Sequence, residues 1–284
     1  MRSAAAMPRR SARLAAQAAA AACPLLLLSD DVLEVVGHQI SDALRPAVAG
    51  ALAACNHNLW RVMRAPLAKL QPRHAAARAL AAKVGSSCAA LHEATRLSWI
   101  DKGLDAADMA TLAMLFSTGA LARVERLSLQ NNRFGPAGAS ALLAGLGCGA
   151  ASRVTLLSLH NTGLRNEGAS ILAAALARGA LPKLEALHID VNQLGDEGLA
   201  ALAGPLRRRP GLKKLYLSGN RIGDPGAAAL VENLGDKELK QLELLSLANN
   251  QITDAGLASL TAAIQGGRLP ALRLSTLGHS PTHS

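Results

Sequence analysis

A short apolar pattern, LxxLxLxxN or a close variant, returns six times in the second half of this 284-residue chain. Its first-position residues are Ala94, Val124, Val154, Leu184, Leu212 and Leu242, with a degenerate seventh copy at Leu269. Successive copies therefore lie 27 to 30 residues apart. A nearly fixed period of this length is typical of a solenoid, in which each unit packs only on its neighbours.

Each copy predicts a strand followed by a helix. The fourth and sixth positions are again apolar, as in Leu127 and Leu129, which indicates a short strand with one buried face. Apolar residues then fall four and eight positions after a glycine, as in Leu142 and Leu146 after Gly138. That spacing marks one face of an α-helix. The unit is therefore strand, turn and helix.

Helix starts are predicted where side chains can accept free amide hydrogens. Asp196, Asp224 and the pair Thr253 and Asp254 precede the helical stripes of three units. Pro225 also fits a first turn, because its missing amide has no partner to lose there. One unit is too small to fold alone, so the array from Ala94 to Leu277 is expected to be one cooperative α/β body.

These repeats resemble the leucine-rich repeat family, in its long, helix-bearing ribonuclease-inhibitor-like subclass. The resemblance implies a horseshoe with parallel strands on the concave side and helices on the convex side. It also implies that the asparagine ending each motif bonds to neighbouring turn backbone and forms a structural ladder. The ladder residues would be Asn132, Asn192, Asn220 and Asn250, with Lys102, Thr162 and Leu277 at the equivalent places of the other units.

Charge and composition narrow the function classes. The net charge is +10, and aromatic residues make up only 2% of the chain, so few side chains could stack on bases. The cluster Arg207, Arg208, Arg209, Lys213 and Lys214 is either a patch for import or an anionic partner, or a solvated helix end that favours cations. Four cysteines without a CxxC pair favour a reducing, intracellular setting and argue against structural zinc.

The first 28 residues contain four arginines and no acidic residue. They are consistent with an organelle transit peptide, a secretory signal or a disordered Ala-rich tail. No uninterrupted apolar run is long enough to span a bilayer.

Residues 25–70 predict three short helices. Ser29 or Asp30 can cap the first helix, and apolar stripes follow. The segment resembles an F-box, in which a leucine, a proline and two acidic residues precede one helix, and a later helix carries a cysteine and a tryptophan; Ser29 replaces the proline here. The resemblance implies that a Skp-type adaptor would bind through Leu28, Leu33, Val36, Leu52 and Trp60. Alternatively, these helices only cap the open core of the first repeat.

A further linking helix is predicted from Pro72 to Gly85, since proline suits a first turn and glycine a helix C-terminus. The expected organisation is an Ala/Arg-rich tail or targeting segment at 1–24, F-box-like or capping helices at 25–70, linking helices at 71–93, repeats at 94–277 and a disordered tail at 278–284.

The outward strand positions are the predicted binding surface. Because neighbouring strands lie about 4.8 Å apart, His188 should lie beside Tyr216, and His160 beside Asp190, with Lys214 close by. Tyr216 is the only tyrosine and stands at an outward position, where core packing does not explain it. A metal or catalytic cluster is one interpretation, and a hot spot for a protein client is the favoured one.

The sequence contains no GxSxG, HExxH or phosphate-loop motif, so no catalytic, cofactor-binding or metal-binding residue is predicted. The leading hypothesis is a non-enzymatic, F-box-like substrate receptor for a cullin-type ubiquitin ligase, a monomer within its complex, cytoplasmic or nuclear. It would need no cofactor, would not bind nucleic acid and would have no membrane span. The alternatives are a scaffold or GTPase regulator whose N-terminal helices serve only as a cap, and import into an organelle through the Arg-rich N-terminus.

Overall fold

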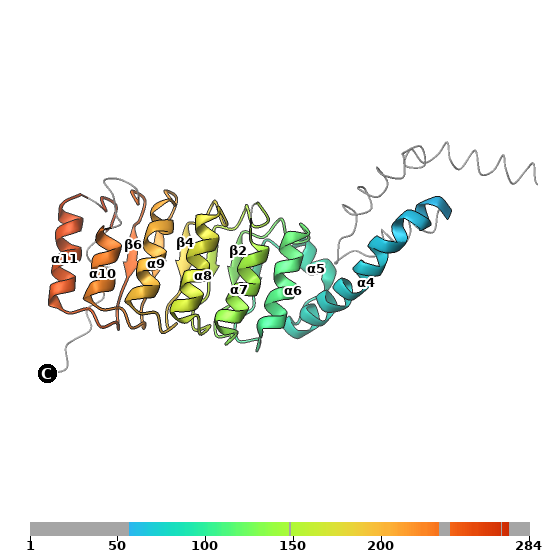
Figure 1. The fold of residues 1–284 in the computed structure, drawn as a ribbon, viewed down its shortest axis with the longest axis horizontal. Helices are drawn as coiled ribbons and strands as arrows, with labels where there is room; N and C mark the ends of the chain where they lie inside the picture. The colour runs from blue at the N-terminus through green and yellow to red at the C-terminus, as the bar shows by residue number, and fades with distance from the viewer. Residues whose placement is uncertain (1–56, 148, 233–238, 268, 273–284) are drawn as a thin grey trace, which may run out of the picture. The chain divides into compact units, whose positions relative to one another are not determined.

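The computed structural model describes residues 57–147, 149–232, 239–267 and 269–272. The chain divides into two compact units, Met1–His74 and Ala75–Ser284, and the boundary falls inside helix α4 (His57–Val84). All the strands and the remaining described helices belong to the second unit. Figure 1 shows the helices of that unit standing side by side in chain order.

Strands and helices alternate along the second unit. They are α5 (Cys88–Glu93), β1 (Arg96–Ser98), α6 (Ala106–Ser117), β2 (Arg126–Ser128), α7 (Gly135–Gly145), β3 (Leu156–Ser158), α8 (Arg165–Ala177), β4 (Ala186–His188), α9 (Asp196–Arg207), β5 (Lys214–Tyr216), α10 (Asp224–Glu232), β6 (Leu244–Ser246) and α11 (Asp254–Gln265). The strands form one parallel sheet of six strands in the order of the sequence. This confirms the predicted α/β repeat solenoid.

The register of the sheet follows the repeat. Equivalent residues of successive units are paired, such as Leu127 with Leu157 and Leu187 with Leu215. These leucines are fully buried, as are the helix residues Leu172 and Leu202. The alternation predicted from the sequence therefore places one side of each strand in a core shared with the helices. We call the opposite, outward side of the six strands the strand face.

The ladder asparagines lie at the ends of the strands. The Asn192 side-chain oxygen accepts the amides of Thr162 (3.0 Å) and Leu164 (3.1 Å), both one unit earlier. Its nitrogen donates to the carbonyls of Leu159 (2.7 Å) and Asp190 (3.0 Å). Because the side chain is fully buried, these bonds satisfy backbone groups that no water reaches.

Asn132, Asn220 and Asn250 bond to the unit before them in the same way. At the third unit the hydroxyl of Thr162 donates to the carbonyl of Leu159 (2.9 Å), which replaces the donor of an asparagine but not its acceptor. At the first unit Lys102 contributes only its backbone amide, which donates to Asn132.

Asp196 and Asp224, two of the predicted helix starts, accept amides of the next unit rather than those of their own helix. Helices α9 and α10 begin at Asp196 and Asp224, as predicted. The Asp196 carboxylate, however, accepts the amides of Gly223 (2.7 Å) and Gly226 (3.0 Å), which belong to the following unit. An aspartate at the first helical residue projects sideways from its helix, so its carboxylate reaches the start of the adjacent helix. Of the predicted helix starts, Thr253 caps its own helix by accepting the Ala255 amide, and Asp105 likewise caps its own helix at the start of α6.

The seventh copy begins three residues later than predicted. In the earlier units the first-position amide donates to the carbonyl three residues before it, as Val124 does to Leu121. The matching bond in the last copy joins Leu272 to Leu269 (3.2 Å). The first position is therefore Leu272 and not Leu269. Leucines at both positions, and again at 274 and 277, gave the sequence pattern two possible registers.

Helix α4 also differs from the prediction. It is one helix of 28 residues that runs through Pro72, so Pro72 does not start a separate helix and the expected boundary after residue 70 falls inside α4. The predicted end is confirmed: Gly85 follows the helix with φ of 75°, and the Ser86 amide donates to the Ala81 carbonyl (2.8 Å).

Candidate protein-binding face

An aromatic stack occupies the middle of the strand face. His188 and Tyr216 are register partners on β4 and β5, with ring centroids 4.1 Å apart and an angle of 28° between the ring planes. Both side chains are half-buried. Burial lowers the pKa of His188, and the nearby Asp190 carboxylate opposes that shift only in part. The imidazole is therefore mostly neutral at pH 7 and stacks as an uncharged ring.

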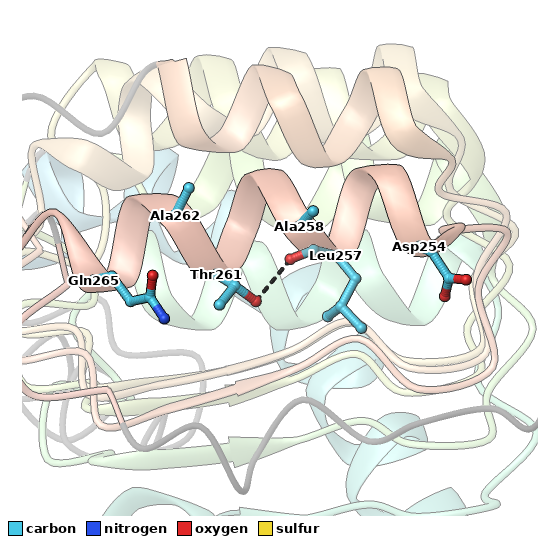
Figure 2. Close-up of a pocket in the computed structure, with 6 residues that line it drawn as sticks. All are labelled: Asp254, Leu257, Ala258, Thr261, Ala262 and Gln265. Atoms are coloured by element: carbon cyan, nitrogen blue, oxygen red, sulfur yellow. Dashed lines mark hydrogen bonds between the residues drawn. The ribbon is translucent and has the colours of Figure 1, made fainter.

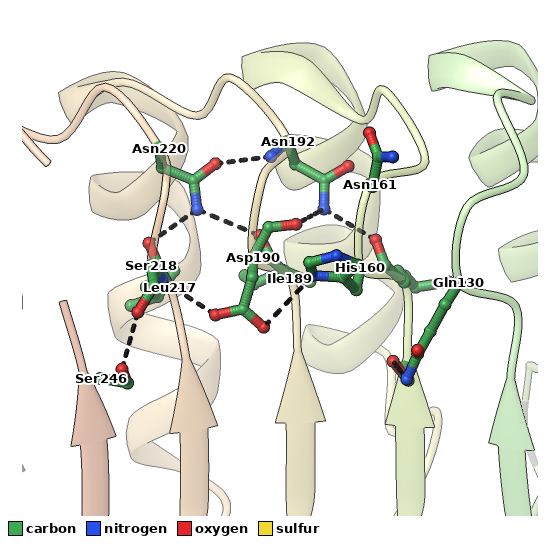
Figure 3. A network of polar contacts seen from close by, with 12 residues as sticks. Gln130, His160, Asn161, Ile189, Asp190, Asn192, Leu217, Ser218, Asn220 and Ser246 are labelled. Atoms are coloured by element: carbon green, nitrogen blue, oxygen red, sulfur yellow. Dashed lines mark hydrogen bonds and ion pairs between the residues drawn. The ribbon is translucent and has the colours of Figure 1, made fainter. Parts of the chain in front are cut away.

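A chain of polar contacts crosses the strand ends beside this stack (Figure 3). The Asp190 carboxylate accepts the Ser218 amide (2.9 Å), and its other oxygen lies 4.0 Å from Nδ1 of His160. The Ser218 hydroxyl lies 2.6 Å from that of Ser246. The predicted neighbours His160 and Asp190 are thus in contact, but through an arrangement that bonds the carboxylate to backbone. Such contacts order the strand ends.

A hollow of about 310 Å³ lies on the strand face at the start of the strands. Its lining includes the apolar side chains of Leu156 and Ala186 and the rings of His188 and Tyr216. Ala186 is register partner of the larger Leu156 and Lys214, so its methyl group leaves space that their side chains surround. The hollow was not predicted, although an alanine in this row of larger residues was the signal for it.

Basic side chains border the hollow. Arg126, Lys213 and Lys214 line it, together with the single acidic residue Glu185. Lys213 is paired with Glu185 at 3.1 Å. Arg126 and Lys214 are exposed, and their side chains make no ion pair or hydrogen bond with the described residues. Lys214 therefore lies beside the predicted aromatic pair, as expected, and the hollow carries uncompensated positive charge.

One member of the predicted Arg207–Lys214 cluster, Arg209, has a structural role. Arg209 donates to the carbonyls of Leu176 and Ala180 (2.7 Å to the latter), which lie at and just after the C-terminus of α8. A guanidinium there satisfies carbonyls that the helix leaves free and interacts favourably with its dipole. Burial lowers the pKa of Arg209. Of the two interpretations of this cluster, the helix-end one therefore fits Arg209.

A second hollow, of about 380 Å³, lies along the outer face of α11 (Figure 2). It is lined by Asp254, Leu257, Ala258, Thr261, Ala262 and Gln265. Leu257 and Thr261 are half-buried, whereas their equivalents on α9, Leu199 and Ala203, are buried. In the earlier units, the following helix packs against the equivalent surface. We therefore interpret it as a stacking surface and not as a ligand site.

The predicted adaptor-binding residues Leu28, Leu33, Val36 and Leu52 lie outside the described residues. Trp60 lies in α4, but its side chain is also outside them. Within the described part of the chain, no group of three or more His, Cys, Asp or Glu side chains is arranged to hold a metal ion. No described helix combines the length and apolar character required to cross a membrane.

Comparison with known proteins agrees with this architecture. A family model described as Leucine Rich repeat matches residues 124–143, 180–203, 212–231 and 240–260. No curated protein sequence matches the chain. Together with the register-paired strands, the family match shows that the array is a leucine-rich repeat solenoid.

Solved structures similar to this chain include the C-terminal domain of tropomodulin from Caenorhabditis elegans, at 15% identity and a TM-score of 0.41, covering 56% of this chain and 92% of that one. An internalin from Listeria monocytogenes matches at 20% identity and a TM-score of 0.37, covering 65% of this chain. The chain spans 47% of the length of that internalin.

Proposed function

We propose that this chain is a non-enzymatic interaction protein that binds a protein client on its strand face. The observation that carries the proposal is the half-buried His188–Tyr216 stack, which lies beside a hollow in the middle of the sheet. Tyrosine combines apolar area with a polar tip and often anchors interfaces. The leucine-rich repeats support the same class, because a solenoid presents an extended surface built from many short strands.

The client site is tested by comparing variants of the full chain in affinity capture. Tyr216→Ala should weaken client binding by about 2 kcal/mol, because a central anchor commonly dominates an interface. Arg178→Ala, at the exposed C-terminal end of α8 on the helix side, should change it by no more than about 0.5 kcal/mol. Equal capture of a client by Tyr216→Ala and wild type would show that the stack is ordinary solvated surface.

We further propose that residues 25–70 recruit a Skp-type adaptor, which would make the chain a substrate receptor for a cullin-type ubiquitin ligase. The support is the F-box-like sequence pattern that includes Leu28, Leu33 and Trp60. The ribonuclease-inhibitor-like subclass is part of the same proposal, supported by units of about 30 residues that each carry a helix. Cytoplasmic or nuclear residence would follow from such a role.

The adaptor proposal has its own experiment. Leu33→Asp should abolish capture of the adaptor and cullin by the full chain, because a charge would then occupy an apolar contact. Circular dichroism of the same variant should keep the melting transition of the repeats. If Leu33→Asp and wild type capture the adaptor equally, or if neither captures it, the ubiquitin-ligase role is removed. A scaffold or GTPase regulator with a helical cap is then favoured.

A further inference from the structure

The row of outward residues at the start of the strands has an order that the repeat does not require. From β2 to β5 it runs Arg126, Leu156, Ala186 and Lys214, each the register partner of the next. A cation thus stands at each end, and apolar side chains lie between them. Three strand spacings separate the two cations, which corresponds to about 14 Å.

An extended peptide has a matching geometry. Side chains two residues apart point to the same side of an extended chain, and four residues span about 13 Å. Two carboxylates four residues apart can therefore reach both cations while the residue midway between them enters the hollow. Ala186 has the smallest side chain in this row and Leu156 beside it is also apolar, so that middle residue should be apolar.

Resting on the proposed client site, we propose that this hollow binds an acidic segment of the client, with the pattern acidic-x-apolar-x-acidic, lying across the strands. Its carboxylates pair with Arg126 and Lys214, and its apolar side chain packs on Leu156 and Ala186. Tyr216 forms the wall beside that apolar side chain. Glu185 does not oppose the segment strongly, because Lys213 already pairs with it.

The same features argue against nucleic acid at this site. The face of Tyr216 that meets His188 is already covered, at 4.1 Å between centroids, so it cannot also stack on a base. The lining of the hollow includes the apolar side chains of Leu156 and Ala186, and only two of its cations lack an ion-pair partner among the described residues. An anionic polymer gains mainly from many cations, whereas an acidic peptide also gains from burying its apolar residue.

The probes are fluorescein-labelled twelve-residue peptides that carry Glu-Ser-Leu-Ser-Glu between Gly-Ser flanks, titrated with the full chain at low ionic strength. The acidic peptide should bind about ten-fold or more tightly than its Lys-Ser-Leu-Ser-Lys counterpart, because rim charges of the wrong sign repel. Replacing the central leucine by glycine should weaken binding about five-fold, because the hollow then stays empty.

Variants of the chain assign the binding to this site. Arg126→Glu and Lys214→Glu should each weaken the acidic peptide about ten-fold, and Ala186→Leu should weaken it by filling the hollow. Arg221→Glu, an exposed charge reversal outside the hollow, should leave the affinity within about two-fold of wild type. The melting transition of every variant is measured to show that the fold is kept.

Other outcomes overturn the inference. Equal binding of acidic and basic peptides, or binding that ignores Arg126→Glu and Lys214→Glu, would exclude an acidic segment. Tighter binding of a single-stranded DNA oligomer, with no effect of the central leucine, would indicate a general anion surface. If client capture depends on Tyr216 while excess acidic peptide fails to compete, this inference falls but the proposed client site stands. If no captured client depends on Tyr216, both fall.

Discussion

The starts of α7 and α8 are built differently from the helix starts that follow, although all belong to the same repeat. Gly135 and Arg165 open these two helices in the left-handed region, with φ of 62° and 56°. Their amides donate to the backbone carbonyls of Thr162 and Asn192 in the following unit, both at 2.9 Å. At these two helices, then, the helix start bonds to the unit after it, whereas α6 starts with a capping box in which Asp105 and Asp108 bond within the same helix.

In the second half the same amide bonds to the unit before it. The acceptor is a side chain at the first turn of the preceding helix: Gly195 donates to Asn166 (2.7 Å), Gly223 to Asp196 (2.7 Å) and Thr253 to Asp224 (2.8 Å). The backbone at Gly195 and Thr253 is extended there, with φ of −102° and −90°. Bonds from Thr253 also hold the pKa of Asp224 below its ordinary value.

One sequence position explains the difference. For the two left-handed starts, the residues equivalent to these acceptors in the preceding unit are Ala106 and Pro136, which have no side-chain acceptor. Where that residue is Asn166, Asp196 or Asp224, the amide turns back toward it. The acceptor then lies against a glycine: a Cβ on Gly226 would lie 2.5 Å from the Asp196 carboxylate. A side chain in one unit thus selects the backbone conformation of the next.

The strand side shows no such division, and the largest predicted effect tests this. Leu127→Ala in the first half and Leu215→Ala in the second should each lower the free energy of unfolding by about 2–5 kcal/mol, because both leucines are fully buried. The two losses should agree within about 1 kcal/mol if the strand side is uniform. Ser128→Ala on the strand face should change stability by less than about 0.5 kcal/mol. Urea unfolding measures all three, and an unchanged midpoint for either leucine variant would contradict the repeat register.

The second prediction concerns the backward bonds. Asp196→Ala should cost about 1–2 kcal/mol, because two amides at the start of α10 lose their acceptor. Asp196→Asn should keep most of the stability, since Asn166 performs the same role one unit earlier. Asp254→Ala is the matched control. No described helix follows α11, so this change should stay within about 0.5 kcal/mol. A cost for Asp254→Ala equal to that for Asp196→Ala would mean that the carboxylates act on their own helices.

The sequence predicted the strand side almost completely because its chemistry is periodic. Apolar residues at Leu127 and Leu157 recur at fixed spacing, and the pairing of His188 with Tyr216 follows from that spacing alone. The bonds between helices were not predicted. An aspartate at the first helical residue has the same local pattern whether it caps its own helix or the next one. Only the lateral distance between helices decides the partner, and no single-unit pattern contains it.

The candidate site was predictable to the same extent. Outward positions placed His160, His188, Asp190 and Tyr216 in adjacent strands, which the structure bears out as geometry. The hollow over Ala186 depends on the volume missing between neighbours, a property of several units together. The continuity of α4 was missed because proline usually marks a first turn, whereas Pro72 lies within this helix.

A third prediction uses the left-handed starts. A non-glycine residue in that region is strained, so Arg165→Gly should raise the free energy of unfolding by about 0.5 kcal/mol, the relief being partly offset by the greater freedom of unfolded glycine. Gly135→Ala should lower it by about 1 kcal/mol for the opposite reason. Pro136→Asp would supply the missing acceptor, and in that background Arg165→Gly should no longer stabilise the protein. A stabilisation that persists there would separate the left-handed turn from the acceptor.

The smallest effect tests whether the strand face and the helix starts act independently. Because burial lowers the pKa of His188 below its ordinary 6.5, the unfolded chain takes up this proton more readily than the folded protein. The contribution of neutral His188 to the free energy of unfolding is fully present above about pH 6.5. It is lost as the pH falls from there through the folded-state pKa. The effect should be modest, since the His188 side chain is only half-buried. Facing it are His160 just after β3, Asp190 just after β4 and Lys214 on β5, all of which bear on the same titration.

Urea unfolding at pH 8 and pH 5 measures this loss in wild type and in His188→Gln, which should show a smaller decrease. Asp196→Ala should leave the His188-dependent part unchanged, because separate sites without shared partners act additively. If His188→Gln loses as much stability on acidification as wild type, burial of this imidazole does not contribute to the pH dependence. If Asp196→Ala alters the His188-dependent part, the bond that sets the start of α10 also adjusts the sheet, and the two sides of each unit are coupled.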